Sequence, residues 1–239
     1  MGVKRAPSTQ ALPTVLVFGG SFDPVHNGHV ALVKHFVEKL QIQEVRIIPA
    51  GQPWQKDKLV ANAEQRVAML EQAFADDLAV PFVIDQQEIE RAKHQVPSFS
   101  VDTLSNLRAE LGPEVSLNLL IGADQLHNLT TWKDWPRLFT LANIVVAARP
   151  GYSDQLTDLP TTLAEFWQKV SADIGDLKHH AFGKTYIETE LAWDVSATEL
   201  RKELQQTNGK AGQTKQCASL IPHKVLDYIQ QHKLYQETF

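Results

Sequence analysis

The sequence predicts an α/β fold with a doubly wound, mostly parallel sheet and a helical C-terminal part. Two observations predict it. Short β-branched runs alternate with segments of helical periodicity along most of the chain, and two helical segments follow the last of these runs. Strands that alternate with helices favour a parallel sheet covered by helices on both faces.

The elements of the first half follow from periodicity and from the positions of glycine and proline. Residues 14–20 (TVLVFGG) form a β-branched run that ends in glycines, which indicates a buried strand. A helix is expected from Gly28 to Leu40, because apolar residues recur there at helical spacing. The pattern then predicts a strand at 44–50, a helix at 64–74, a strand at 81–85 and a helix at 100–111.

The second half continues this alternation with one interruption. Strands are expected at 116–122, 143–149 and 185–191, and helices at 133–142, 196–206 and 222–234. Residues 151–184 break the rhythm and are interpreted as an insertion of helix and loop. We expect a flexible tail at 1–13, a single domain over 14–239 and a mobile loop at the polar residues 207–216.

Composition excludes several classes of protein. The 239 residues have a formal net charge of −5, which disfavours general nucleic-acid binding. Cys217 is the one cysteine, so neither an internal disulfide nor a cysteine zinc cluster can form. The first residues, MGVKRAPSTQALP, do not resemble a signal peptide, and no apolar run approaches the roughly 18 residues that span a membrane. We therefore expect a cytoplasmic protein with no nucleic-acid or membrane partner.

The stretch FGGSFDPVHNGH (18–29) lies where the first strand passes into the first helix. Ligands of doubly wound sheets bind at the carboxyl ends of strands, and the N–H groups at a helix N-terminus attract anions. His26 and His29 lie at this position and can both donate to phosphate oxygens. Two alternatives remain open: a glycine-rich turn with solvated histidines, and a zinc site with Asp23 as third ligand. The stretch matches neither the Walker loop nor the dinucleotide fingerprint.

The same residues resemble a known family. His26-Asn27-Gly28-His29 resembles the H-x-G-H motif of the nucleotidyltransferase superfamily, and VSATELR (195–201) resembles its second motif. The resemblance implies a Rossmann-like nucleotidyltransferase fold that binds ATP. The ATP-binding positions that it implies are Gly19, Gly20, Ser21, Phe22, His26, His29, Gly122, Asp124, Ser196, Thr198 and Arg201.

Further segments resemble the bacterial nicotinate-nucleotide adenylyltransferases. They are IPAGQPWQK (48–56), PSFSVDTL (97–104), IGADQLHNLTTWKDWPRLF (121–139), VVAARPGY (145–152) and IPHKVLDYIQQHKLY (221–235). The resemblance implies that ATP and nicotinate mononucleotide are the substrates, that deamido-NAD and pyrophosphate are the products, and that Mg²⁺ is bound with ATP. The implied mononucleotide-binding residues are Ser100, Val101, Trp132 and Arg149.

Some of these residues also have simpler interpretations. Ser100 has the sequence position of an N-cap for helix 100–111, and Asp124 could cap a loop. Trp132 could belong to the core, and Arg149 could be a solvated arginine at a strand end. Ser196 and Glu199 have capping-box spacing, which explains those two residues but neither Thr198 nor Arg201.

A phosphate monoester is largely a dianion at neutral pH, so the mononucleotide needs no general base. We therefore assign His26 and His29, with Lys56 and Arg201, to stabilisation of charge as the phosphate attacks the α-phosphorus of ATP. Two departures from the family pattern stand out. The loop QPWQK lacks the histidine that members often have before the position of Lys56, and Ala197 replaces a common serine.

Three other activities remain as alternatives. The first is the same transfer to nicotinamide mononucleotide, and the second is a phosphopantetheine or cytidylyl transferase. The third is a non-catalytic nucleotide-binding module. The sequence predicts no oligomeric state.

Overall fold

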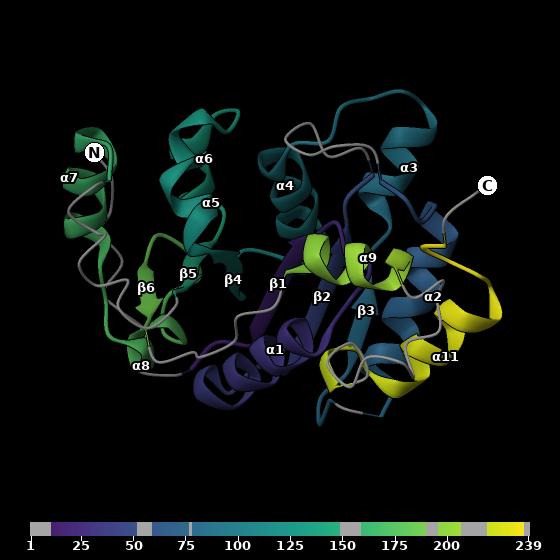
Figure 1. The fold of residues 1–239 in the computed structure, drawn as a ribbon. Helices are drawn as coiled ribbons and strands as arrows, with labels where there is room; N and C mark the ends of the chain where they lie inside the picture. Colours follow the sequence, from purple (N-terminus) through teal and green to yellow (C-terminus); the bar gives the residue numbers. More distant parts are fainter. Residues whose placement is uncertain are drawn as a thin grey trace. The chain divides into compact units, whose positions relative to one another are not determined.

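The fold was examined in a computed structural model of the chain. The structure describes residues 11–51, 59–76, 78–148, 159–189, 196–206 and 219–236. Lys56, Arg149 and the expected mobile loop at 207–216 lie outside the described residues. The elements are shown in Figure 1. In chain order they are β1 (Thr14–Gly20), α1 (Asn27–Leu40), β2 (Glu44–Pro49), α2 (Ala63–Phe74), β3 (Phe82–Ile84), α3 (Gln87–Lys93), α4 (Ser100–Leu111), β4 (Ser116–Gly122), α5 (Ala123–His127), the 3₁₀ helix η1 (Leu129–Thr131), α6 (Trp135–Leu138), β5 (Asn143–Ala147), α7 (Thr161–Val170), α8 (Ile174–Leu177), β6 (Thr185–Glu188), α9 (Ala197–Gln206) and α11 (His223–Gln231).

The six strands form one sheet in the order β3-β2-β1-β4-β5-β6. The pairs β1–β4, β4–β5 and β5–β6 are parallel, and Phe18 of β1 is paired with Leu120 of β4. This order is that of a doubly wound sheet. The chain adds β2 and β3 on one side of β1 and then adds β4, β5 and β6 on the other side, so the direction of strand addition reverses between β1 and β4. The predicted fold class is confirmed. Ligands of such sheets bind at the carboxyl ends of the two strands that flank the reversal.

Contacts divide the chain into two compact units. Unit 1 comprises Met1–Phe18, Phe36–Arg46 and Phe99–Ala192, and unit 2 comprises Gly19–His35, Ile47–Ser98 and Trp193–Phe239. The expectation of one domain over 14–239 remains a prediction.

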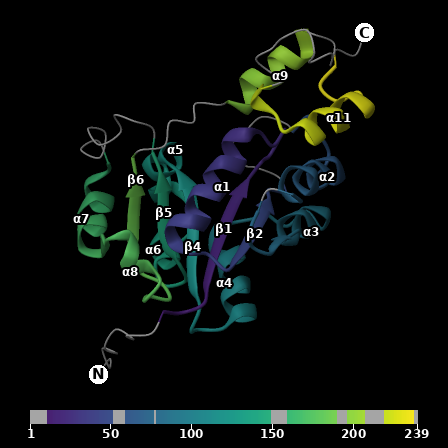
Figure 2. The ribbon, with the colours of Figure 1, turned by 90° about the horizontal axis from the view of Figure 1, so that it is seen from below.

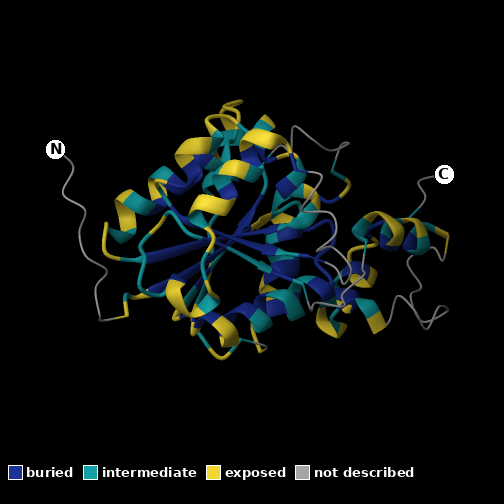
Figure 3. Cartoon of the chain, turned by 90° about the vertical axis from the view of Figure 1, so that its left-hand side faces the viewer, coloured by how far each residue is buried: buried dark blue, intermediate teal, exposed yellow. Residues whose placement is uncertain are grey.

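The strands form the buried layer of the fold, as Figure 3 shows by their dark blue colour. The side chains of Leu16, Ile47 and Val145 are fully or almost fully buried. Apolar residues on both faces of a strand are typical of a parallel sheet that is covered on each side. The helices differ from the strands because they have buried residues on one face and exposed residues on the other.

In unit 1, polar side chains form hydrogen bonds to the backbone just before β4, β5 and β6 begin. Arg108 of α4 makes five hydrogen bonds to the carbonyls of Gly112, Val115, Leu141 and Ala181, which all precede these strands. Asn143 donates to Asn118 Oδ1 at 3.2 Å and to the carbonyl of His180 at 2.9 Å. Buried polar groups that are fully paired fix one arrangement of the chain. Figure 2 shows β4, β5 and β6 side by side, with α7 next to β6.

Several elements differ from the sequence-based expectation. The helix expected at 133–142 covers only Trp135–Leu138, and its later start follows from the left-handed φ of 50° at Asp134. The short helices α3 and α5 were not predicted. The expected insertion at 151–184 contains α7 and α8 within its described residues, and Leu163, Trp167 and Leu177 of these helices are buried.

Within the described part of the chain, no helix is both long enough and apolar enough to cross a bilayer.

Candidate active site

The two histidines of the H-x-G-H motif form a reciprocal pair in unit 2. Their rings are stacked, with centroids 3.6 Å apart and 22° between the planes. His29 Nδ1 accepts the backbone N–H of His26 at 3.2 Å, and His26 Nδ1 accepts the backbone N–H of His29 at 3.4 Å. The tight turn at the start of α1 brings the two residues together, since the N–H of His29 also donates to the carbonyl of His26.

This geometry indicates the tautomer of each ring. A neutral imidazole has one donor nitrogen and one acceptor nitrogen, so accepting at Nδ1 places the proton on Nε2. Burial lowers the pKa of His26 from 6.5 to about 4, and its ring is therefore neutral at pH 7. In both rings Nε2 is then the donor nitrogen, which suits the pair to donating hydrogen bonds rather than to acting as a general base.

The histidine loop, which we define as residues 21–29, is shaped by buried contacts. Phe22 is buried with a left-handed φ of 48°, and its ring meets the ring of His29 edge-on at 5.1 Å. A Cβ atom at Gly20 would lie 3.0 Å from the Phe22 ring, so a side chain there would force the ring to shift. The Phe22 ring in turn packs against one side of the His29 ring.

Asp23 is the buried centre of this loop. Its carboxylate accepts the N–H groups of Val60 and Ala61 at 2.8 and 3.1 Å, and the hydroxyl of Tyr235 at 2.6 Å. Burial raises the pKa of Tyr235 well above its usual value, so the tyrosine is a neutral donor. Three donors leave the buried Asp23 carboxylate little capacity to bind a metal, so the structure does not favour Asp23 as the third ligand of the zinc alternative.

The second motif lies next to the histidine loop within unit 2. Arg201 of α9 donates through Nη1 to the backbone carbonyl of Asp23 at 2.6 Å and through Nη2 to Thr198 Oγ1 at 3.3 Å. Ser196 Oγ accepts the N–H of Glu199 at 3.5 Å, which is one half of the capping box suggested by the spacing. Residues of the two motifs, which are distant in sequence, therefore lie in direct contact.

Arg66 of α2 is a site residue that the sequence reasoning missed. Its side chain is 1% exposed, and it donates to the carbonyls of Ser21 at 2.9 Å and of Ala50 at 2.7 Å. Burial lowers the pKa of this guanidinium, and the nearby Asp23 partly offsets that effect. An arginine inside a helical pattern is normally read as solvent-exposed, so no local signal identified it.

In unit 1, the first turn of α4 has backbone donors that lack a partner within the described part of the chain. The N-cap of α4 is Phe99 and makes no side-chain capping bond, so the interpretation of Ser100 as N-cap is wrong. The first N–H groups that bond back to Phe99 are those of Asp102 and Thr103. Among the described residues, the N–H groups of Ser100 and Val101 have no hydrogen-bond partner, and such groups favour an anion.

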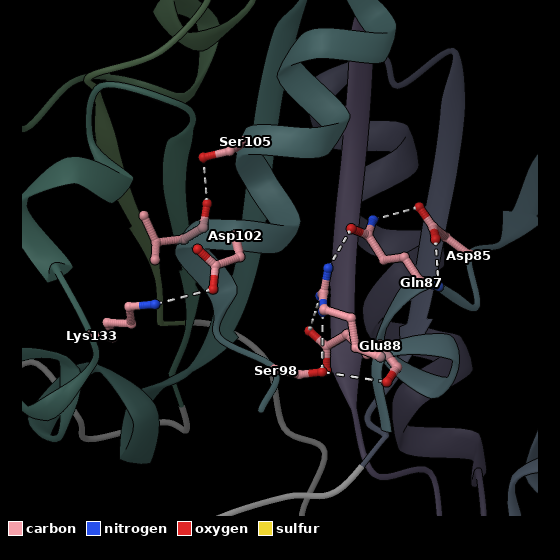
Figure 4. Close-up of polar contacts among 9 residues, drawn as sticks. Asp85, Gln87, Glu88, Ser98, Asp102, Ser105 and Lys133 are labelled. Carbon is pink, nitrogen blue, oxygen red and sulfur yellow. Dashed lines mark hydrogen bonds and ion pairs between the residues drawn. The ribbon is translucent and has the colours of Figure 1, made fainter. Parts of the chain in front are cut away.

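The residue after Trp132 contacts this same first turn of α4. Lys133 lies 4.4 Å from the centre of the Phe99 ring, and its Nζ is 3.4 Å from Asp102 Oδ2. Figure 4 shows Lys133 and Asp102 pointing toward one another, with Ser105 one turn further along α4. Trp132 is only half-buried and is not a core residue. Trp135 instead packs edge-on against Phe139 and Phe166.

A second polar cluster in Figure 4 belongs to unit 2. Arg91 donates to Gln87 Oε1 at 3.1 Å and to Ser98 Oγ at 3.3 Å, and Gln87 donates to Asp85 Oδ2 at 2.9 Å. These contacts hold α3 to the residues that precede and follow it. The cluster fixes the chain up to Ser98, next to Phe99 in the sequence.

Asp124 lies in the first turn of α5, at the carboxyl end of β4. Gly122 is the N-cap of α5 and Asp124 follows it within the helix, so Asp124 is not the capping residue. A Cβ atom at Gly122 would lie 2.5 Å from Asp124 Oδ1. The absence of a side chain at Gly122 is therefore what permits this position of the carboxylate, which is exposed.

The chain resembles known proteins over most of its length. Residues 17–203 match the cytidylyltransferase-like family. A probable nicotinate-nucleotide adenylyltransferase of Herminiimonas arsenicoxydans is 42% identical over 222 residues, which are 93% of this chain and 96% of that protein. One from Dechloromonas aromatica is 40% identical over 225 residues, with 93% and 97% covered.

A solved structure gives the same fold. It is the nicotinic acid mononucleotide adenylyltransferase of Plasmodium falciparum complexed with NaAD, with a TM-score of 0.67 at 17% identity. The match covers 93% of this chain and 97% of that chain.

Proposed function

This chain belongs to the nicotinate-nucleotide adenylyltransferases of the cytidylyltransferase-like family, and on that premise we propose that it transfers the adenylyl group of ATP to nicotinate mononucleotide, forming deamido-NAD and pyrophosphate. The resemblance found in the sequence motifs is thereby confirmed. The reciprocal pair of His26 and His29 is the observation on which the chemical assignment depends.

ATP is assigned to the residues of unit 2. The two Nε2–H groups of the pair, the N-terminal turn of α1 and Arg201 together form a set of donors suited to phosphate oxygens. Thr198 adds a hydroxyl next to Arg201. From the sequence resemblance, Asp124 is assigned to ribose hydroxyls of the nucleotide, which an exposed carboxylate can accept from.

Nicotinate mononucleotide is assigned to the residues of unit 1. The N–H groups of Ser100 and Val101 would donate to the nicotinate carboxylate, and the Trp132 ring would stack on the pyridine ring. Lys133 supports this assignment because it joins the Trp132 segment to the first turn of α4. A helix N-terminus favours an anion, so the acid is preferred over the amide.

The reaction needs donors and no base. The 5′-phosphate dianion attacks the α-phosphorus, its oxygen forms the new P–O bond, and pyrophosphate leaves with the electrons of the bond that breaks. Neutral imidazoles and Arg201 stabilise the charge on the phosphate oxygens during this displacement. From the sequence resemblance alone, Lys56 is assigned to charge stabilisation and Arg149 to contact with the mononucleotide.

Mg²⁺ is proposed to enter bound to the triphosphate, where it would neutralise part of the phosphate charge. Among the described residues there is no group of three or more His, Cys, Asp or Glu that could enclose an ion. The metal ligands would then be phosphate oxygens and water. We propose the cytoplasm as the location, since ATP is a substrate.

The decisive experiment measures pyrophosphate release and dinucleotide formation from purified protein with ATP and either nicotinate or nicotinamide mononucleotide. We expect product from both or from the acid alone, with the higher kcat/KM for the acid. No product from either mononucleotide would favour the non-catalytic module, and a higher kcat/KM for the amide would reverse the proposed preference.

A further inference from the structure

The C-terminal segment, which we define as residues 219–236, contacts the histidine loop at two points. Tyr235 donates its hydroxyl to Asp23 Oδ1 at 2.6 Å, and Asn27 Nδ2 donates to the carbonyl of Ser219 at 2.8 Å. These two contacts fall on either side of His26 in the sequence. Helix α11, which lies between Ser219 and Tyr235, packs beside α2 in both Figure 1 and Figure 2.

Tyr235 is held firmly in this position. It is 3% exposed and has a left-handed φ of 58°, which a residue with a side chain rarely adopts. Such a backbone conformation persists when the surrounding contacts determine it, and here these are the buried ring and the bond to Asp23. The tyrosine is therefore more than the frayed end of a helix.

Asp23 connects Tyr235 to the groups assigned to phosphate. The carboxylate of Asp23 is buried and has three donors, and its backbone carbonyl accepts Arg201 Nη1. A buried carboxylate that loses one donor is no longer fully compensated and shifts toward other donors or water. A shift of Asp23 moves the carbonyl on which Arg201 rests and the loop that ends in the histidine pair.

We propose that Tyr235 is a positioning residue for the triphosphate: acting through Asp23, its hydroxyl holds Arg201 and the histidine loop in the arrangement that binds ATP. The proposal rests on the proposed function in one respect, namely that ATP is the ligand of unit 2. It assigns the C-terminal segment a role in nucleotide binding in addition to packing against α2.

The test compares Tyr235→Phe with Tyr228→Phe, a matched control that removes a hydroxyl from α11 itself. Calorimetric titration measures the affinity for ATP alone and for nicotinate mononucleotide alone, so no turnover is needed. We expect Tyr235→Phe to weaken ATP binding about tenfold, the cost of one hydrogen bond to a charged group, with mononucleotide affinity within about twofold of wild type. Tyr228→Phe should leave both affinities unchanged.

Two results would overturn the proposal. One is a lower unfolding temperature for Tyr235→Phe with unchanged ATP affinity, which would make the contact purely stabilising. The other is an equal loss for both ligands, which would indicate general loosening. Wild-type turnover is measured in parallel, so that binding of ATP without product counts against the proposed function and leaves the Tyr235 comparison intact.

Hydrogen exchange on the wild type keeps the proposal testable even if Tyr235→Phe fails to fold. ATP should slow amide exchange both at residues 59–61 and at residues 232–236, because Asp23 joins the two, and mononucleotide alone should not. Unchanged exchange at both segments with saturating ATP would contradict the coupling.

Discussion

His26 and His29 each accept at Nδ1 a hydrogen bond from the other residue's backbone N–H, at 3.4 and 3.2 Å respectively. Neither ring can then carry its proton on Nδ1 when neutral. The H-x-G-H spacing thus does more than place two imidazoles together, since it also selects which nitrogen of each ring can donate to a ligand.

The first prediction uses this tautomer. Replacing His29 by Ala should lower kcat by ~10²-fold or more, as the loss of one preorganised donor does. His29→Gln should retain more activity than His29→Asn, because a glutamine amide can reach the position of Nε2 and an asparagine amide that of Nδ1. Steady-state kinetics on the three variants decides the matter. Equal losses in all three would mean that the Nε2–H group is not the contributing atom.

The second prediction concerns stability against pH. The pKa of His26 falls from 6.5 to about 4 on folding, so the unfolded chain binds more protons between these values. Stability is therefore retained above pH 6.5 and decreases as the pH falls toward 4. From pH 7 to 5, the wild type should lose about 2 kcal/mol more than His26→Gln does. Urea unfolding at the two pH values measures this, and parallel losses in both proteins would refute it.

The third prediction concerns Arg66. Arg66→Met removes two hydrogen bonds to the carbonyls of Ser21 and Ala50, together with the cation near Asp23. We expect a loss of about 2–4 kcal/mol in the free energy of unfolding. Arg137→Met is the control, because that side chain is 55% exposed and should change stability by less than about 0.5 kcal/mol. Similar losses in the two variants would show that the buried bonds contribute little.

The fourth prediction is that substitution of Trp132 affects KM for one substrate and not for the other. Loss of ring stacking worth about 1 kcal/mol should raise KM for nicotinate mononucleotide about fivefold in Trp132→Ala. KM for ATP should stay near the wild-type value, and Trp132→Phe should restore most of the affinity for the mononucleotide. If both KM values rose together, the tryptophan would have a structural role only.

The fifth prediction concerns Gly122. A Cβ atom in Gly122→Ala would lie 2.5 Å from Asp124 Oδ1, so the carboxylate must move. If Asp124 accepts the ribose hydroxyls of ATP, KM for ATP should rise about fivefold or more. Gly175→Ala is the matched control, since a Cβ atom there meets no atom within 4 Å. An unchanged KM for ATP in Gly122→Ala would remove the basis for the assignment of Asp124.

Periodicity predicted the strands and long helices well because it reflects which faces are buried. It failed for α3, whose sequence QEIERAK has Ile89 as its one buried residue and therefore shows no apolar stripe. It also overestimated the helix at 133–142, where Asp134 adopts a left-handed conformation that the apolar pattern does not reveal.

The motif residues of the site could be identified from sequence, whereas the residues that support them could not. Asp23 and Tyr235 are 212 positions apart, and no local pattern joins them. Lys133 would be read as a solvated lysine without the Phe99 ring beside it. Supporting residues act through contacts that exist only in the folded chain, so a single sequence holds little information about them.

The five hydrogen bonds of Arg108 have a consequence for protein engineering. They secure β4, β5 and β6 where these strands start, which is the end opposite the loops that hold Asp124 and Trp132. The contacts that make the strands rigid therefore lie at one end of the sheet, and the residues assigned to substrate selectivity lie at the other. A library that randomises the residues after β4, around Asp124 and Trp132, can search for new acceptors of the adenylyl group while Arg108 keeps the scaffold intact.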